Sequence, residues 1–162
     1  MPGMRAATLR ENPKSGFTLV ELMVVMALIG ILTGIAFPNI LAYLPTFRLH
    51  SAARQVMTDL NYARGRAASL NEKFKIVFSP GTGKYEVMQN DQSVGPDEWL
   101  LDKQETSLEE NGIVVLSPDS LTCQPTGTMT NTTIKLQNSE GQYLEITTSL
   151  GGRIKKGTII NE

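Results

Sequence analysis

Glu21 is the residue whose position in this sequence most directly suggests chemistry. It is the only ionisable side chain in an otherwise apolar segment from Phe17 to Phe37. Holding a carboxylate inside a bilayer costs roughly 2.5 kcal/mol or more, so such a group is usually kept for a partner. We therefore expect the Glu21 carboxylate to bind a partner group. The simpler alternative is a single-pass anchor helix in which this carboxylate has no specific role.

The other reactive side chains do not assemble a catalytic or metal-binding pattern. His50 is the only histidine and has no second ligand nearby, so a solvent-facing helix residue is the simpler interpretation. Cys123 is the only cysteine, which excludes an intramolecular disulfide and favours a small buried or half-exposed thiol. The stretch from Gly81 to Lys84 is similar to the end of a phosphate-binding loop, but Tyr85 replaces the required Ser or Thr, so it predicts a hairpin turn. We expect no enzyme activity, no cofactor and no metal.

The segment that positions Glu21 is long enough to cross a membrane. Its 21 residues from Phe17 to Phe37 would form a helix about 31 Å long, close to the thickness of the hydrocarbon core of a bilayer. Pro38 marks its far end. An ordinary secretory signal is cut after its apolar region, whereas Gly16 precedes this one. Cleavage at Gly16 would therefore leave a membrane helix on the mature chain.

Charges before the apolar segment predict the orientation of the chain. Residues 1–16 contain three basic side chains and one acidic one, and a basic flank stays on the cytoplasmic side. The chain beyond Pro38 should then lie across the membrane. Without residues 1–16 the chain keeps 12 of its 15 basic and 15 of its 16 acidic residues, so its formal net charge becomes −3. This mild acidity gives no general reason to expect a polyanion partner, and any such contact needs a local patch.

The residues from Lys14 to Leu22 resemble the class III signal of type IV prepilins and type II secretion pseudopilins. The shared features are a Lys-Ser-Gly leader end, Phe17 directly after it, Glu21 as the fifth mature residue, and Pro38 further along the helix. The resemblance implies that a prepilin peptidase cuts after Gly16, that Phe17 is N-methylated, and that the helix drives polymerisation with other pilins. It also implies that Glu21 neutralises the N-terminal amine of a neighbouring subunit. Before assembly, the chain would be a single-pass protein of the bacterial inner membrane with its C-terminal domain in the periplasm.

Periodic patterns divide the remaining sequence into a helix and a β-rich region. Between residues 38 and 71, apolar residues at steps of three and four predict an amphipathic helix. From residue 72 to 162 the period changes to two, with turn residues between the apolar runs. The helical stripe consists of Leu49, Ala52, Ala53, Val56, Leu60, Ala63, Ala67 and Leu70. The predicted strands cover residues 74–78, 84–88, 99–101, 113–116, 132–136, 143–147 and 153–155, and we expect surface loops at 90–98 and 102–111.

The C-terminal region narrows the resemblance. Residues 133–147 and 149–155 are similar to the closing hairpin and Gly-Arg strand of GspH/FimT-type minor pilins, and residues 47–53 and 60–64 are similar to the helix of the same group. The implied fold is α+β: a long N-terminal helix, transmembrane and then amphipathic, packed against a small antiparallel β domain of two sheets. The implied parts are a leader at 1–16, a polymerisation helix at 17–37, its amphipathic continuation at 38–71 and a β domain at 72–162.

Some FimT-type proteins are DNA receptors that use a Gly-Arg-x-Arg motif near the C-terminus. The corresponding residues here are Gly152-Arg153-Ile154-Lys155, followed by Lys156. A lysine in the last motif position keeps the charge but loses the planar fork that grips phosphate in two places. The alternative is an ordinary final strand with Ile154 inward and Arg153 and Lys155 in solvent.

Together these features predict a non-enzymatic filament subunit, a minor pilin or pseudopilin at or near a filament tip. A shaft-forming major subunit is one alternative. A DNA-uptake receptor is another, and it depends on Arg153, Lys155 and Lys156. Because the polymerising helix is common to type II secretion and type IV pili, the sequence favours neither machinery.

Overall fold

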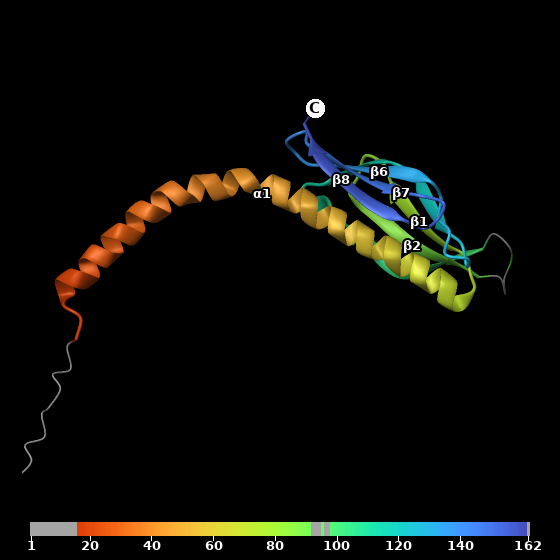
Figure 1. Cartoon of the computed structure of the whole chain (residues 1–162), viewed down its shortest axis with the longest axis horizontal. Helices are drawn as coiled ribbons and strands as arrows, with labels where there is room; N and C mark the ends of the chain where they lie inside the picture. The colour runs from red at the N-terminus through yellow and green to blue at the C-terminus, as the bar shows by residue number, and fades with distance from the viewer. Residues whose placement is uncertain (1–15, 92–94, 96–97, 162) are drawn as a thin grey trace, which may run out of the picture. The chain divides into compact units, whose positions relative to one another are not determined.

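The computed structural model describes residues 16–91, 95 and 98–161, so the predicted leader up to Ser15 lies outside the described residues. The chain divides into two compact units, residues 1–41 and 42–162. One helix, α1, runs from Leu19 to Leu70 and contributes residues to both units (Figure 1). The helix is continuous through Pro38 and Pro45.

The described part of the first unit consists of α1 up to Leu41 and the short segment before the helix. Residues Leu19–Phe37 have a mean hydropathy of 2.4 and are long and apolar enough to cross a membrane. None of these side chains is buried. A continuous exposed apolar surface of this size needs cover from lipid or from another protein.

The second unit contains two antiparallel sheets of four strands each (Figure 1). The strand order is β3-β2-β1-β5 in the first sheet and β4-β6-β7-β8 in the second. The strands are β1 (Phe74–Ser79), β2 (Lys84–Asn90), β3 (Trp99–Ser107), β4 (Val114–Ser117), β5 (Ser120–Cys123), β6 (Thr132–Gln137), β7 (Tyr143–Thr148) and β8 (Ile154–Ile160), and a 3₁₀ helix, η1 (Glu109–Asn111), precedes β4. The predicted α+β fold of a long helix and two small antiparallel sheets is confirmed.

The core of the second unit is formed by the buried stripe of α1 and the inward residues of the strands. Seven of the eight predicted stripe residues, from Leu49 to Ala67, are buried. The eighth, Leu70, is 41% exposed because it is the last residue of α1. In β1 the buried positions alternate with half-buried ones, as the period of two predicts. Burying each large apolar side chain contributes about 1.5–3 kcal/mol.

Asn71 ends the helix. Its φ of 55° lies in the left-handed region, which asparagine tolerates better than most residues. The N–H of Glu72 donates to the carbonyl of Ala67 at 3.3 Å, which satisfies one of the last carbonyls of α1. The predicted helix end near Asn71 is therefore confirmed.

The expectation of a surface loop over residues 102–111 is wrong in its first part, because β3 continues to Ser107. The alternation of inward and outward side chains is interrupted in this strand by two irregularities in the pairing of β3 with β2. The structure also contains β5, which the sequence did not indicate, since it has only four residues and pairs with β1. Short strands with polar residues leave little periodic signal.

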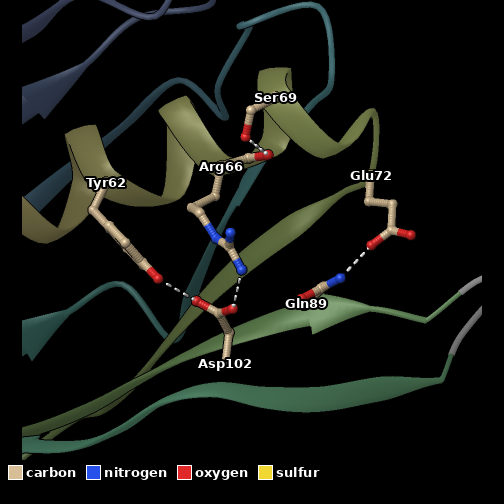
Figure 2. A network of polar contacts seen from close by, with 6 residues as sticks. All are labelled: Tyr62, Arg66, Ser69, Glu72, Gln89 and Asp102. Carbon is tan, nitrogen blue, oxygen red and sulfur yellow. Dashed lines mark hydrogen bonds and ion pairs between the residues drawn. The ribbon is translucent and has the colours of Figure 1, made fainter.

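One irregularity in β3 lets Asp102 reach α1. Val87 pairs with Lys103 and Met88 pairs with Leu101, so Asp102 is an extra residue in a bulge. Figure 2 shows two side chains of α1 converging on its carboxylate. The hydroxyl of Tyr62 donates to Oδ2 at 2.9 Å, and Nη2 of Arg66 lies 3.2 Å from Oδ1. The next residue, Lys103, forms an ion pair with the buried carboxylate of Asp59 on α1. Strand β3 is thus held to the helix by two consecutive side chains.

Candidate assembly site and basic strand

The first turn of α1 is organised by a hydrogen bond between Thr18 and Glu21. Oγ1 of Thr18 accepts from the backbone N–H of Glu21 at 3.1 Å, and the carbonyl of Thr18 accepts from the N–H of Leu22 at 3.2 Å. Thr18 is therefore the N-cap, and Glu21 lies in the first turn, where the positive end of the helix dipole favours a carboxylate. Thr18 is not among the residues predicted from the sequence, although the pattern Thr-x-x-Glu is the usual signature of a capping box.

The predicted cleavage site lies just outside α1. Gly16 and Phe17 belong to no helix or strand, and both are exposed. The Phe17 side chain is 86% exposed. A Cβ atom added at Gly16 would meet nothing within 4 Å, so the structure places no steric demand of its own on this position. The Gly16–Phe17 peptide bond therefore lies in an exposed part of the chain just before the helix.

Glu21 is exposed and has no side-chain partner among the described residues. Within the same range, it is the only carboxylate or cation in the exposed apolar stretch Leu19–Phe37. Pro38 lies within α1 directly after that stretch, and its side chain is outside the described residues. The geometry thus leaves one carboxylate at the start of an uncovered apolar helix, available to a second molecule.

The predicted basic motif begins in the turn between β7 and β8. Gly152 is buried, has a φ of 74°, and donates its N–H to the carbonyl of Ser149 at 2.8 Å. Its own carbonyl accepts from Nη1 of Arg64 on α1. A Cβ here would clash with the carbonyl oxygen of Gly127 and come within 3.1 Å of Arg64. The glycine of the motif therefore has a packing role.

The three cations of the motif do not share one face of β8. Lys155 pairs with Thr147, which is exposed, whereas Lys156 pairs with Ile146, which is buried. Because paired residues of an antiparallel sheet lie on the same face, Lys155 points to the outer face and Lys156 points to the side of α1. Arg153 is exposed just before the strand. The structure thus brings Arg153 and Lys155 to the outer side and separates Lys156 from them.

Lys156 instead lies beside His50 of α1. Its Nζ is 3.5 Å from Nδ1 of His50, a residue 106 positions earlier. Burial lowers the pKa of His50, and the positive charges of Lys156 and Arg54 lower it further. The predicted solvent-facing position of His50 is only partly right, because the ring is half-buried. No sequence signal linked His50 to Lys156, since the contact depends on the fold.

The structure also describes Cys123 and the Gly81–Lys84 stretch. Cys123 is buried, and this burial raises its pKa to about 12, so the thiol is protonated at neutral pH. The Gly81–Lys84 stretch is the turn of the β1–β2 hairpin, with Ser79 paired to Lys84. Within the described parts of the chain, no group of three or more His, Cys, Asp or Glu residues could hold a metal ion.

Two parts of the sequence match known families. Residues 52–152 match the type II transport protein GspH, and residues 12–37 match the prokaryotic N-terminal methylation motif. The type IV major pilin protein PilA of Myxococcus xanthus is 57% identical over 52 residues. That alignment covers 32% of this chain, and it spans only 22% of the length of PilA.

Two solved structures share the fold. The minor pseudopilin EpsH from the type 2 secretion system of Vibrio cholerae superposes with a TM-score of 0.56 at 17% identity, covering 68% of this chain and 97% of EpsH. The type IV minor pilin FimU of Pseudomonas aeruginosa superposes with a TM-score of 0.54 at 19% identity, covering 72% of this chain and 92% of FimU. At these identities the likeness concerns the fold alone.

Proposed function

The chain belongs to the family of type II transport protein GspH, and we propose that it is a minor pilin or pseudopilin subunit that a prepilin peptidase processes and that assembles through its apolar helix. The match of residues 12–37 to the N-terminal methylation motif carries this proposal. The family and the fold are those of structural subunits. The proposal covers both a type IV pilus and a type II secretion pseudopilus, because minor subunits of each have this fold.

Cleavage after Gly16 would create the assembly-competent end of the chain. The bond lies outside α1 and is exposed, which suits binding in a peptidase cleft. Removing the leader would convert the amide nitrogen of Phe17 into an amine, which N-methylation leaves protonatable. The same cut would leave Thr18 and Glu21 in place as the first turn of the helix.

Glu21 would then pair with the terminal amine of a neighbouring subunit. A lone carboxylate in an apolar environment is costly, and a cation within hydrogen-bond reach offsets part of that cost. The exposed apolar side chains around it would move from lipid to contacts with other helices. The carboxylate thus specifies which helices pack together and in which register.

Before assembly, the apolar stretch Leu19–Phe37 would anchor the subunit in the inner membrane, with residues 42–162 in the periplasm. Three basic residues and one acidic residue in positions 1–16 favour this orientation. We place the subunit at or near the filament tip, because the resemblance of residues 133–155 to GspH/FimT-type minor pilins implies this position. A shaft-forming major subunit is the second form of the same proposal, because part of the chain is similar to a major pilin.

Mass spectrometry of the membrane-extracted protein tests the processing step. We expect a chain that begins at N-methylated Phe17. Gly16→Ala should leave the leader attached, and since a Cβ at this position meets nothing within 4 Å, the change does not disturb the folded chain itself. A native chain that begins elsewhere, or an unmethylated Phe17, contradicts the proposal.

Replacing Glu21 tests the assembly step. Glu21→Gln keeps the shape of the side chain but removes its charge, so membrane insertion should be retained or improved while recovery with other pilins falls. Glu140→Gln, an exposed change in the turn between β6 and β7, is the matched control. Unchanged recovery of the Glu21 variant at equal expression would assign the carboxylate another role.

A second candidate function is DNA binding through the basic strand. The favouring observation is that Arg153 and Lys155 are exposed on the outer side and form no ion pair within the described residues. Cations of this kind contact phosphates without reading the base sequence. We rank this function below filament assembly, because Lys156 is directed toward α1 and because the mature chain would carry a net charge of −3.

A further inference from the structure

Two large aromatic side chains are exposed on the outer face of α1 in the second unit. Tyr43 is 73% exposed and Phe47 is 62% exposed. His50 and Arg54 follow at steps of three and four, so all four residues lie along one face of the helix, away from the buried stripe. Lys156 of β8 joins this face at His50. We call these five residues the aromatic–cationic face.

The cations of this face have no counterion within the described residues. Arg54 and Lys156 are exposed and belong to none of the four ion pairs found there. Lys156 nevertheless lies 3.5 Å from the ring nitrogen of His50 instead of pointing freely into water. Lys156 and Arg54, one on each side of His50, place two positive charges close together on this face.

Among the described residues, the charged groups that act on His50 are both basic. They are Lys156 on β8 and Arg54 on α1, and both lower the pKa of the ring. A carboxylate brought to this place would be attracted by two full charges at once and would stabilise the contact between β8 and α1. The surface therefore has an electrostatic preference for an acidic partner.

The aromatic side chains indicate that the partner is a protein. Tyr, Phe and Arg are enriched in protein interfaces, and aromatic residues supply much of their binding free energy. Exposed aromatic residues beside unpaired cations match a partner surface that has carboxylates next to an apolar patch.

We propose that the aromatic–cationic face docks a carboxylate-bearing surface of an adjoining pilin-type subunit. This inference rests on the proposed function, since it needs a neighbouring subunit, but it concerns the second unit of the chain and not the apolar stretch. It assigns Lys156 to a protein contact, whereas the DNA hypothesis assigns it to phosphate.

Zero-length cross-linking of the full chain in the membranes of producing cells tests the contact. A carbodiimide joins a lysine amine to a carboxylate only when the two touch, and the carboxylate oxygen leaves with the reagent as a urea. We expect Lys156 to be linked to an Asp or Glu of a second polypeptide that has an apolar N-terminal helix of this type, at least ten times more often than Lys155. Links that are absent, equal at both lysines, or confined to one chain would overturn the proposal.

A charge reversal gives an independent test. Arg54→Glu with Lys156→Glu should lower recovery in filaments at least tenfold, whereas Arg48→Glu with Lys73→Glu, two exposed cations elsewhere on the domain, should not. If Glu21→Gln prevents incorporation but the reversal does not, the docking proposal fails and the filament function stands. If Glu21→Gln itself has no effect, the carboxylate has another role. The filament function itself fails if the native chain does not begin at N-methylated Phe17. A reversal that abolishes retention of duplex DNA while filament recovery is unchanged would also overturn the docking proposal.

Discussion

The hydroxyl of Tyr85 donates a hydrogen bond of 2.6 Å to Oδ2 of Asp59, and both side chains are buried. Burial raises the pKa of Tyr85, and the hydrogen bond to Asp59 raises it further, so the phenol is protonated and donates at neutral pH. The other carboxylate oxygen of Asp59 accepts from Lys103. This pair joins α1 to β2 and, through Lys103, to β3.

Tyr85→Phe should lower the free energy of unfolding by about 1–3 kcal/mol, because it removes one donor from a buried carboxylate. Tyr143→Phe, which removes a half-exposed hydroxyl with no described hydrogen bond, should change it by less than about 0.5 kcal/mol. Urea unfolding of the detergent-solubilised chain, followed by the fluorescence of Trp99, measures both. Equal effects of the two changes would mean that Asp59 finds a replacement donor.

Gly152→Ala should destabilise the chain by about 1–3 kcal/mol, because the residue has a positive φ and a Cβ would clash with the carbonyl of Gly127. Gly151→Ala is the matched control, since a Cβ there meets nothing within 4 Å and its φ is ordinary. The same urea unfolding experiment compares them. A Gly152→Ala chain as stable as the control would show that the turn moves away from Arg64 without cost.

His50 should make stability fall as the pH decreases. Burial, Lys156 and Arg54 hold the pKa of His50 below its ordinary value of 6.5 in the folded chain. The unfolded chain therefore binds more protons once the pH falls below about 6.5, which favours unfolding on acidification. We expect a lower thermal unfolding temperature at about pH 5 than at about pH 7.5, and a smaller difference in His50→Gln than in the unmodified chain. Identical pH dependence of the two chains would contradict this role.

The DNA hypothesis predicts a salt-sensitive interaction that does not depend on base sequence. Replacing Arg153, Lys155 and Lys156 by Gln should abolish weak binding to duplex DNA. The change at Arg153 and Lys155 alone should remove most of it and reduce the slope of log K against log salt by about 2, since each phosphate contact contributes about 0.9. Fluorescence anisotropy at several salt concentrations measures both quantities.

The control for that experiment is the corresponding change at Lys73, Lys75 and Lys84 on the first hairpin, which should do much less. Binding that is absent at low salt, or lost equally in both triple variants, would return Arg153 and Lys155 to the role of exposed residues beside an edge strand.

The parts of the fold that could be predicted are those set by local periodicity. The apolar stripe from Leu49 to Ala67 correctly predicted the buried face of α1. The alternation in β1, together with the Gly81–Lys84 turn, correctly predicted the β1–β2 hairpin. The signal at Gly16, Phe17 and Glu21 could be recognised without knowledge of the fold, because its residues are close together in the sequence.

The parts that escaped prediction depend on contacts between distant residues. The sequence predicted only the first residues of strand β3. Polar side chains in the rest of the strand are paired with α1, which a pattern of hydrophobicity does not reveal. In the candidate site, the separation of Lys156 from Lys155 follows from the register of β8 on β7, and the contact with His50 spans 106 positions. A basic run in a sequence therefore indicates total charge and not its distribution between faces.

The bulge at Asp102 has a consequence for the order of folding. In a regular strand, two consecutive residues point to opposite faces. Asp102 and Lys103 can therefore both contact α1 only because Asp102 is the extra residue of a bulge. A β2–β3 hairpin without the helix would lack the contacts that this irregularity makes possible. We therefore expect the register of β3 to be selected by helix residues about 40 positions earlier, and β3 to complete its pairing only after α1 has formed and docked.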